Sequence, residues 1–297
     1  MKTNLTKALN YSLGGAVCAG ALILAANASA QNLFVSDLYA NNIYQYTPGG
    51  VQSTFATGMN FPFGIAFNAN GDLFVANCEN DGGAGYVTKI TRGGVQSTIP
   101  SGSDPKALAF NSAGDLFEAD YHSGNIYKYS GGTLSIFATV PAAPQAMTIN
   151  SAGDLFVGSG YGAGVESITE ITPNGTESTF ATGLSFIGGL AFNGAGNLLV
   201  AQETTGTILQ YTPGGVQSVY ATVNASGLNA IAFDGAGNLF AETGPTIVKI
   251  APGGGQSIFA AGLNNAAGLA FQPVPEPSTF ALIGIGAAAA FFARRRR

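Results

Sequence analysis

One alternation of glycine, polar and hydrophobic residues recurs along most of the chain. The motif G-[DN]-L-[FL] starts at Gly71, Gly114, Gly153, Gly196 and Gly237, and a degenerate copy spans residues 31–34. The Asp or Asn of the six copies stands at positions 32, 72, 115, 154, 197 and 238. Intervals of ~40–45 residues are typical of a four-stranded β-propeller blade. The spacing therefore predicts six blades.

Each repeat divides into four short strand-like segments. In the second repeat these are PFGIAFN, DLFVAN, GYVTKIT and VQSTIPS. Segments such as GIAF and NLFV are apolar on both faces, which is typical of strands covered on both sides. Turn sequences separate the segments: Asn-x-x-Gly at 68–71, and Thr-Pro-Gly-Gly at 47–50, where glycine supplies a positive φ. The pattern predicts an all-β domain.

The order of the segments predicts how the domain closes. After residue 30 the chain begins in a second segment, NLFVSD, and it ends in an unpaired first segment, AGLAFQP. The segment 268–273 would complete the blade that begins at Asn32. We therefore expect a six-bladed β-propeller over 31–273, closed by pairing of N- and C-terminal strands. A linear solenoid would instead need capping units.

The repeats resemble NHL-type blades and, more loosely, those of virginiamycin B lyase and of SMP-30/gluconolactonase-like (TolB-like) propellers. The motifs that carry this resemblance are P-x-G-I-A-F, G-D-L-F-V-A-[DN] and N-x-I-Y-x-[YI]-T-P-G-G. They cover nearly all of 31–273, but their residues are mostly structural. The resemblance implies the fold and does not fix a function.

Residues 1–30 have the three parts of a secretory signal peptide. Lys2 and Lys7 precede an apolar stretch from Leu13 to Ala26, and Ala28 and Ala30 supply the small-x-small pattern that signal peptidase recognises. We expect cleavage after Ala30. The alternative is an uncleaved membrane anchor, although the apolar stretch is short for a span.

The C-terminal residues 274–297 have the pattern of a second targeting sequence. Pro275, Glu276 and Pro277 precede an apolar run from Phe280 to Ala293, which predicts a short helix, and four arginines follow: Arg294, Arg295, Arg296 and Arg297. The arginines act as a membrane stop on the cytoplasmic side. This order resembles the PEP-CTERM sorting signal of Gram-negative bacteria. It implies processing by an exosortase-type membrane protease, with a cell-surface or extracellular product and transient membrane anchoring. A plain tail anchor is the alternative.

The composition and charge of the chain limit the classes of molecule that it can bind and the kinds of site that it can contain. Only 9% of residues are charged, and residues 31–273 contain five basic and fifteen acidic side chains, a net charge of about −10. Such a domain repels phosphate backbones, so nucleic acid is excluded as a partner. Loss of Cys18 with the signal peptide leaves only Cys78, which excludes an internal disulfide. No Cys/His spacing suggests a metal site, so we interpret Cys78 as a buried thiol.

Candidate ligand-binding residues gather in the loops that follow the second segment of each repeat, on one face of the predicted ring. We expect an acidic, partly aromatic channel mouth that binds a cation or a sugar. Ordinary surface polarity is the alternative. Without basic neighbours these acids should stay ionised in water and weakly attract a divalent cation such as calcium. The candidates are Asp37, Tyr39, Asp120, Tyr121, His122, Tyr161, Glu203 and Glu242, with Glu79, Asp81 and Asp104 nearby.

No catalytic residue or defined metal ligand is predicted. The glutamate, asparagines and aspartate of metal-dependent lactonases cannot be matched one by one, and Asn229 is only a loose counterpart. His122, the one histidine, is the sole candidate for a lyase histidine. The leading hypothesis is a non-enzymatic surface or matrix propeller whose partner is an extracellular polysaccharide. A divalent-cation-dependent lactonase or lyase is the alternative, and a purely architectural protein is the third.

Overall fold

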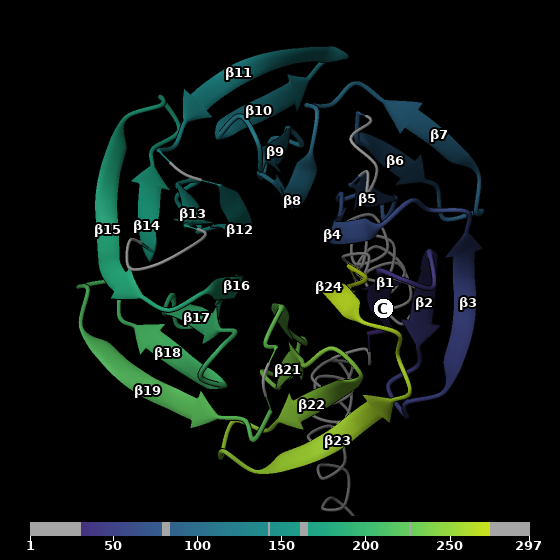
Figure 1. Ribbon diagram of the computed structural model, residues 1–297, viewed down its shortest axis with the longest axis vertical. Coiled ribbons are helices and arrows are strands. Elements are labelled where there is room, and N and C mark those ends of the chain that lie inside the picture. Colours follow the sequence, from purple (N-terminus) through teal and green to yellow (C-terminus); the bar gives the residue numbers. More distant parts are fainter. Residues whose placement is uncertain (1–30, 79–83, 142, 161–165, 226, 274–297) are drawn as a thin grey trace, which may run out of the picture. The chain divides into compact units, whose positions relative to one another are not determined.

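The computed structural model describes residues 31–78, 84–141, 143–160, 166–225 and 227–273. These residues form six four-stranded antiparallel sheets, which surround a central axis as the blades of a propeller (Figure 1). The six-bladed all-β prediction is confirmed. The predicted signal peptide with Ala28 and Ala30, and the tail with its proline pair and arginines, lie outside the described residues. No helix in the described part of the chain is long and apolar enough to cross a membrane.

In each blade the strands run in order from the innermost, at the axis, to the outermost. Blade 1 contains β24 (Ala266–Phe271), β1 (Leu33–Asp37), β2 (Asn42–Tyr46) and β3 (Gln52–Thr57). Blade 2 contains β4 (Pro62–Phe67), β5 (Leu73–Asn77), β6 (Tyr86–Ile90) and β7 (Gln96–Ile99). Blade 3 contains β8 (Pro105–Phe110), β9 (Leu116–Asp120), β10 (Asn125–Ser130) and β11 (Thr133–Thr139).

The other three blades follow the same order. Blade 4 contains β12 (Pro144–Ile149), β13 (Leu155–Ser159), β14 (Glu166–Ile171) and β15 (Glu177–Leu184). Blade 5 contains β16 (Ile187–Phe192), β17 (Leu198–Gln202), β18 (Thr207–Tyr211) and β19 (Gln217–Thr222). Blade 6 contains β20 (Ala230–Phe233), β21 (Leu239–Glu242), β22 (Thr246–Ile250) and β23 (Gln256–Ala261).

Blade 1 closes the ring with strands from both ends of the described chain. β24 pairs antiparallel with β1, with Leu33 opposite Phe271 and Val35 opposite Leu269. In Figure 1 the last strand, coloured yellow, lies beside the purple strands β1 and β2. The predicted closure is thereby confirmed.

The repeated hairpin between the first two strands of a blade depends on one asparagine and one glycine. In blade 2 the Asp72 amide donates to Asn68 Oδ1 at 2.9 Å, and the Gly71 amide donates to Asn68 O at 3.0 Å. Gly71 has a φ of 77°, a conformation that favours glycine. The Asn-x-x-Gly spacing in the sequence is therefore the spacing of this turn.

Aromatic residues from adjacent blades form much of the core. The Phe of the L-F motif packs edge-to-face against the Phe that ends the next blade's first strand, as Phe34 does on Phe67 with ring centroids 4.9 Å apart. Phe156 and Phe192 make the same contact at 5.1 Å. Because these rings meet between blades, the L-F and A-F pairs of the repeat are the residues that join one blade to the next.

Candidate functional site at the channel mouth

The first strands of the six blades surround the axis, and residues at or just before the start of several of them lie at its mouth. Antiparallel topology places the loops after second and fourth strands at this face, and the hairpins at the other. A cavity of about 620 Å³ opens here. Its lining includes polar and aromatic side chains from five blades: Tyr39, Phe63, Gln145, Glu203, Asn229 and Asn265.

Below this cavity the inner strands approach one another too closely for larger side chains. A Cβ placed on Gly64 would lie 2.4 Å from Lys106 O, and one on Gly268 would lie 2.4 Å from Phe63 O. One on Gly188 would overlap Leu228 O. The channel space between the inner strands is only about 90 Å³. A ligand of sugar size therefore has room in the mouth and not along the channel.

Three of the predicted acids are not in open loops but at or beside strand ends, where they are buried. Asp37 and Asp120 end β1 and β9, Glu242 ends β21, and their exposed fractions are 1%, 0% and 0%. The expectation that these carboxylates face water was wrong. The sequence places them beside loops, but the returning chain of the neighbouring inter-blade loop covers them.

Asp37 and Asp120 hold that returning chain. Asp37 Oδ2 accepts the Asn264 amide at 2.7 Å, and Asp120 Oδ2 accepts the Asp104 amide at 2.8 Å. Asn77, which ends β5, does the same in blade 2, accepting the Asn60 amide at 3.0 Å. The [DN] that ends the repeat motif is thus a hydrogen-bond acceptor that fixes the loop entering each of these blades.

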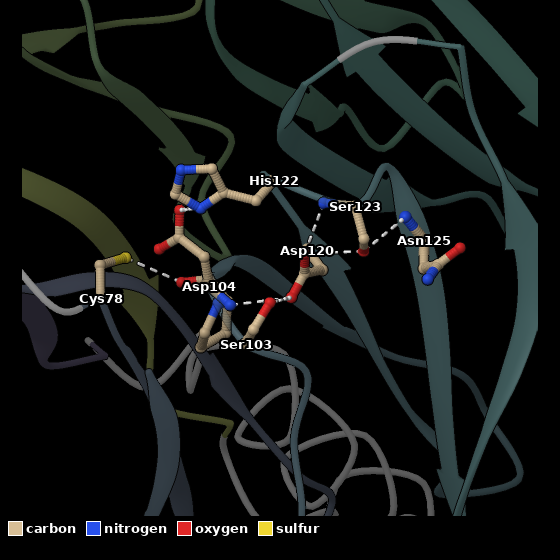
Figure 2. A network of polar contacts seen from close by, with 8 residues as sticks. Cys78, Ser103, Asp104, Asp120, His122, Ser123 and Asn125 are labelled. Atoms are coloured by element: carbon tan, nitrogen blue, oxygen red, sulfur yellow. Dashed lines mark hydrogen bonds and ion pairs between the residues drawn. The ribbon is translucent and has the colours of Figure 1, made fainter. Parts of the chain in front are cut away.

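Asp120 is the centre of a larger polar network (Figure 2). Besides the Asp104 amide it accepts the Ser123 amide at 2.9 Å and the hydroxyls of Ser123 and Ser103 at 2.7 and 3.2 Å. Burial tends to raise the pKa of Asp120, but these hydrogen bonds outweigh it and hold the pKa below its usual range. Asp104 Oδ2 lies 2.9 Å from Nδ1 of the exposed His122.

Cys78 lies at the edge of the same network. Its thiol donates to Pro105 O at 2.8 Å, and burial raises its pKa to about 12. A thiol in this state is a poor nucleophile and metal ligand. The interpretation of Cys78 as a buried structural residue agrees with its contacts.

Two buried glutamates, Glu118 and Glu242, have surroundings that favour the neutral acid. Glu118 in β9 stands where blades 1, 2, 4 and 5 have valine, and burial raises its pKa to about 8 although it accepts the Gly102 amide at 2.7 Å. Burial likewise raises the pKa of Glu242 to about 8, and its Oε1 accepts the Gly244 amide. Neither group presents a carboxylate to the cavity.

The structure brings together only part of the predicted set. Tyr39 and Glu203 line the cavity, and Tyr39 packs edge-to-face on Phe61. Burial raises the pKa of Glu203. Tyr121 and His122 lie on blade 3, next to each other and outside the cavity lining. Tyr161, Glu79 and Asp81 lie outside the described residues.

Sequence reasoning missed Phe63, Gln145 and Lys106 near the start of the inner strands, and it named Asn229 only as a loose counterpart of a lactonase asparagine. Phe63, Gln145 and Asn229 line the cavity, and Lys106 stands at the same position in blade 3, its Nζ 4.1 Å from the centroid of the Phe63 ring. The residue type at this repeat position differs from blade to blade, whereas the residues beside it stay apolar. This variation is the feature of the sequence that could have indicated the cavity lining.

The described residues contain no group of three or more His, Cys, Asp or Glu side chains placed to hold a metal ion. Oxygen ligands for a hard cation would have to include the amides of Gln145, Asn229 and Asn265 beside Glu203. The arrangement offers hydrogen bonds, aromatic faces and a single carboxyl group at one cavity.

Residues 273–297 match the PEP-CTERM protein-sorting motif. The motif indicates export, membrane association of the C-terminus before processing, and processing by an exosortase. No curated protein sequence matches the chain.

Solved structures share the fold. A streptogramin B lyase is similar at 17% identity and a TM-score of 0.57, over 82% of this chain and 76% of that one. A gluconolactonase-type protein is similar at 16% identity and a TM-score of 0.62, over 80% and 89%. A catalytically inactive virginiamycin B lyase from Staphylococcus aureus, in complex with quinupristin, is similar at 18% and 0.57, over 83% and 78%. At these identities the likeness concerns the fold alone.

Proposed function

We propose that this exported propeller is a non-enzymatic cell-surface or extracellular protein that binds a segment of polysaccharide in its mouth cavity. The observation that carries the proposal is the lining of the cavity of about 620 Å³. It combines the rings of Tyr39 and Phe63 with the amides of Gln145, Asn229 and Asn265. Aromatic faces pack on the apolar faces of sugar rings, and amides both donate to and accept from hydroxyls.

The charge of the cavity fits a neutral or weakly charged ligand. Among the described residues of its lining, Glu203 is the one with a carboxyl group, and the ammonium of Lys106 lies on the ring of Phe63 at the cavity edge. The buried acids Asp37, Asp120 and Glu242 are engaged by the protein's own backbone. The proposal therefore rests on hydrogen bonding and ring contacts and not on an acidic field.

Binding of purified exopolysaccharide from the producing cells tests this function. Tyr39→Ala and Gln145→Ala should each weaken binding about three- to tenfold, the effect of losing ~0.7–1.4 kcal/mol. Gln52→Ala, a change on the exposed outer strand β3, is the matched control and should bind as the parent protein does. Equal binding by all three variants would contradict the proposal.

A divalent-cation-dependent lactonase or lyase is the second candidate, because Glu203 and Asn229 supply oxygen ligands at the mouth of a propeller whose fold those enzymes share. Turnover of a lactone or a streptogramin that is lost with a chelator, and lost again in Glu203→Gln, would establish the enzyme. Turnover is not expected, since no described base stands over the cavity with a fixed ligand set.

A further inference from the structure

A second cavity lies between blades 4 and 5, at the hairpin end of the blades and so at the opposite face from the mouth. The two blades are neighbours in the ring (Figure 1). Its volume is about 600 Å³, within the range of small-molecule sites. Four aromatic rings line it: Phe156, Phe180, Phe192 and Tyr211. Phe156 packs edge-to-face on Phe180 and on Phe192, each at 5.1 Å, so the faces of these rings form a preformed apolar wall.

Other blades show what normally lies beside this Phe. In blade 2 the residue opposite Phe74 is Lys89, whose Nζ lies 5.8 Å from the Phe74 ring centroid and 2.9 Å from Asp72 Oδ2. Blade 3 repeats the arrangement with Lys128, which is 5.6 Å from the Phe117 ring and 2.8 Å from an Asp115 oxygen. In blade 6 Lys249 lies over the Phe240 ring at 5.5 Å.

Blade 4 lacks this lysine and has an acid in its place. Glu170 is opposite Phe156, and the aspartate of the repeat is retained as Asp154. In the remaining two blades the corresponding pairs are neutral, Asn32 with Gln45 and Asn197 with Gln210. Among the six described blades, blade 4 is thus the one that has a carboxyl group at both of these positions.

No basic residue in this part of the chain neutralises the two acids. The sequence has no lysine, arginine or histidine between Lys128 and Lys249, and no ion pair of the described residues includes Asp154 or Glu170. Asp154 Oδ2 accepts only the amide of Asn150, at 2.8 Å. Burial raises the pKa of Glu170, and the nearby Asp154 carboxylate raises it further.

We propose that the groove between blades 4 and 5 binds a small organic molecule with a primary ammonium group, which lies over Phe156 where blades 2, 3 and 6 place their own lysine. The ammonium would be held by Glu170 and Asp154 and by the face of the ring. The apolar stem of the ligand would lie against Phe180, Phe192 and Tyr211. The site lies at the other end of the blades from the mouth cavity and does not depend on the function proposed there.

Titration calorimetry with n-hexylamine tests the proposal, with n-hexanol as the uncharged ligand of the same length. The intact protein should bind the amine at least about tenfold more tightly than the alcohol, the difference made by one desolvated cation contact. Glu170→Lys should abolish amine binding, because the new ammonium occupies the place over Phe156 and pairs with Asp154. The same variant should melt about 2–4 °C higher, since a repulsion becomes an ion pair.

Two further variants separate the site from general charge effects. Glu177→Lys makes the same charge change on the exposed start of β15 and should leave amine binding intact. Glu170→Gln neutralises the acid without filling the groove and should weaken the amine several-fold while leaving hexanol unchanged. Equal affinities for amine and alcohol, or amine binding by Glu170→Lys that matches the parent protein, would overturn the proposal.

Discussion

One residue ends the second strand of each blade. In three blades this residue accepts the same kind of backbone hydrogen bond, although two of the residues are acids and one is a neutral amide. Asp37, Asn77 and Asp120 each accept a backbone amide from the loop that enters the first strand of their blade. Asparagine and aspartate both have an oxygen acceptor at this distance, so the position requires an acceptor and not a charge. This explains why either Asp or Asn can stand at this position in blades 1 to 3.

The buried acids differ in whether their surroundings lower or raise the pKa of the carboxyl group. Asp120 accepts four hydrogen bonds and its pKa is lowered, whereas Glu118, two residues earlier in β9, has a pKa raised to about 8 by burial. Glu118 accepts one amide, from Gly102, and the Asp120 carboxylate disfavours its ionised form. The same strand therefore holds one ionised and one neutral acid at neutral pH.

Glu118 should make stability depend on pH. Its pKa is about 8 in the folded protein and 4.5 in an unperturbed glutamate, so the folded state binds this proton more tightly. The stabilising contribution is complete below pH 4.5 and is lost as the pH rises toward 8. Glu118→Gln keeps an acceptor for Gly102 and removes the titration. We expect the variant to be more stable than the parent at pH 9, by on the order of a few kcal/mol, and similar at pH 4.5.

Urea unfolding at the two pH values measures this difference. The Glu242 carboxyl has a similarly raised pKa and adds its own pH dependence. Only the difference between parent and variant is therefore assigned to Glu118. A variant whose free energy of unfolding follows that of the parent at every pH would show that Glu118 is ionised in the folded state.

At the scale of elements, the strands and the closure could be predicted because both follow from local repetition. The spacing of the G-[DN]-L-[FL] copies sets the number of blades, and the leftover first segment at the C-terminal end determines which strands must pair. The positions of Asp37 and Asp120 could not be predicted in this way. Their burial depends on the inter-blade loop that folds over them, and the amide partners Asn264 and Asp104 are not marked by any local pattern.

The lining of the mouth cavity could not be predicted from local repetition either. Asn229 and Gln145 come from different blades, and only the ring closure brings them to one opening. Inner-strand glycines such as Gly188 determine how closely these blades approach, because a Cβ there would overlap Leu228 O. A repeat pattern indicates small residues at such positions, but it does not give the distance between neighbouring strands.

Closure through β24 should be essential for folding. Removing 266–273 deletes the innermost strand of blade 1, exposes the edge of β1, and uncovers the Phe240 ring that packs on Phe271 at 5.0 Å. We expect the shortened protein to aggregate, because an unpaired strand edge and an apolar blade face become accessible. Size-exclusion chromatography and thermal unfolding measure this.

A protein shortened only by residues 274–297 is the matched control for that deletion. It keeps β24 and its pairing with β1, so it should remain monodisperse with an unchanged melting temperature. If removal of 266–273 gave an equally monodisperse protein with the same melting temperature, pairing of the terminal strands would not be what holds the ring closed.

At the scale of the whole molecule, charge is unevenly distributed around the ring. The five lysines and arginines of 31–273 lie in or next to blades 2, 3 and 6, and blades 1, 4 and 5 have none. Two cavities lie at opposite ends of the blades: a polar mouth with amides and one carboxyl group, and an aromatic groove flanked by Glu170. The two cavities thus suit different ligand chemistry.

The contacts that close the ring begin and end close to the two predicted processing positions. The Gln31 side chain donates to Gln272 O at 3.0 Å and accepts the Gly235 amide at 2.7 Å, and the Gln272 amide donates to Asn32 O at 3.0 Å. Cleavage after Ala30 would leave Gln31 in place, and cleavage near Pro275 would leave Gln272 in place. Both cuts would therefore leave the closure contacts of the propeller intact.

Mass spectrometry of the native protein recovered outside the cells should accordingly find a chain that begins at Gln31 and ends near Pro275. Replacing Pro275, Glu276 and Pro277 with alanine should leave the arginine tail attached and keep the protein in the membrane fraction, because the recognition element of the sorting motif is lost while the apolar run remains. Replacing Pro252, in a hairpin of blade 6, with alanine provides a proline control that should be processed normally. Recovery of extracellular protein that still contains Lys2 or the Arg294–Arg297 cluster would show that the ends are anchors and not removable signals.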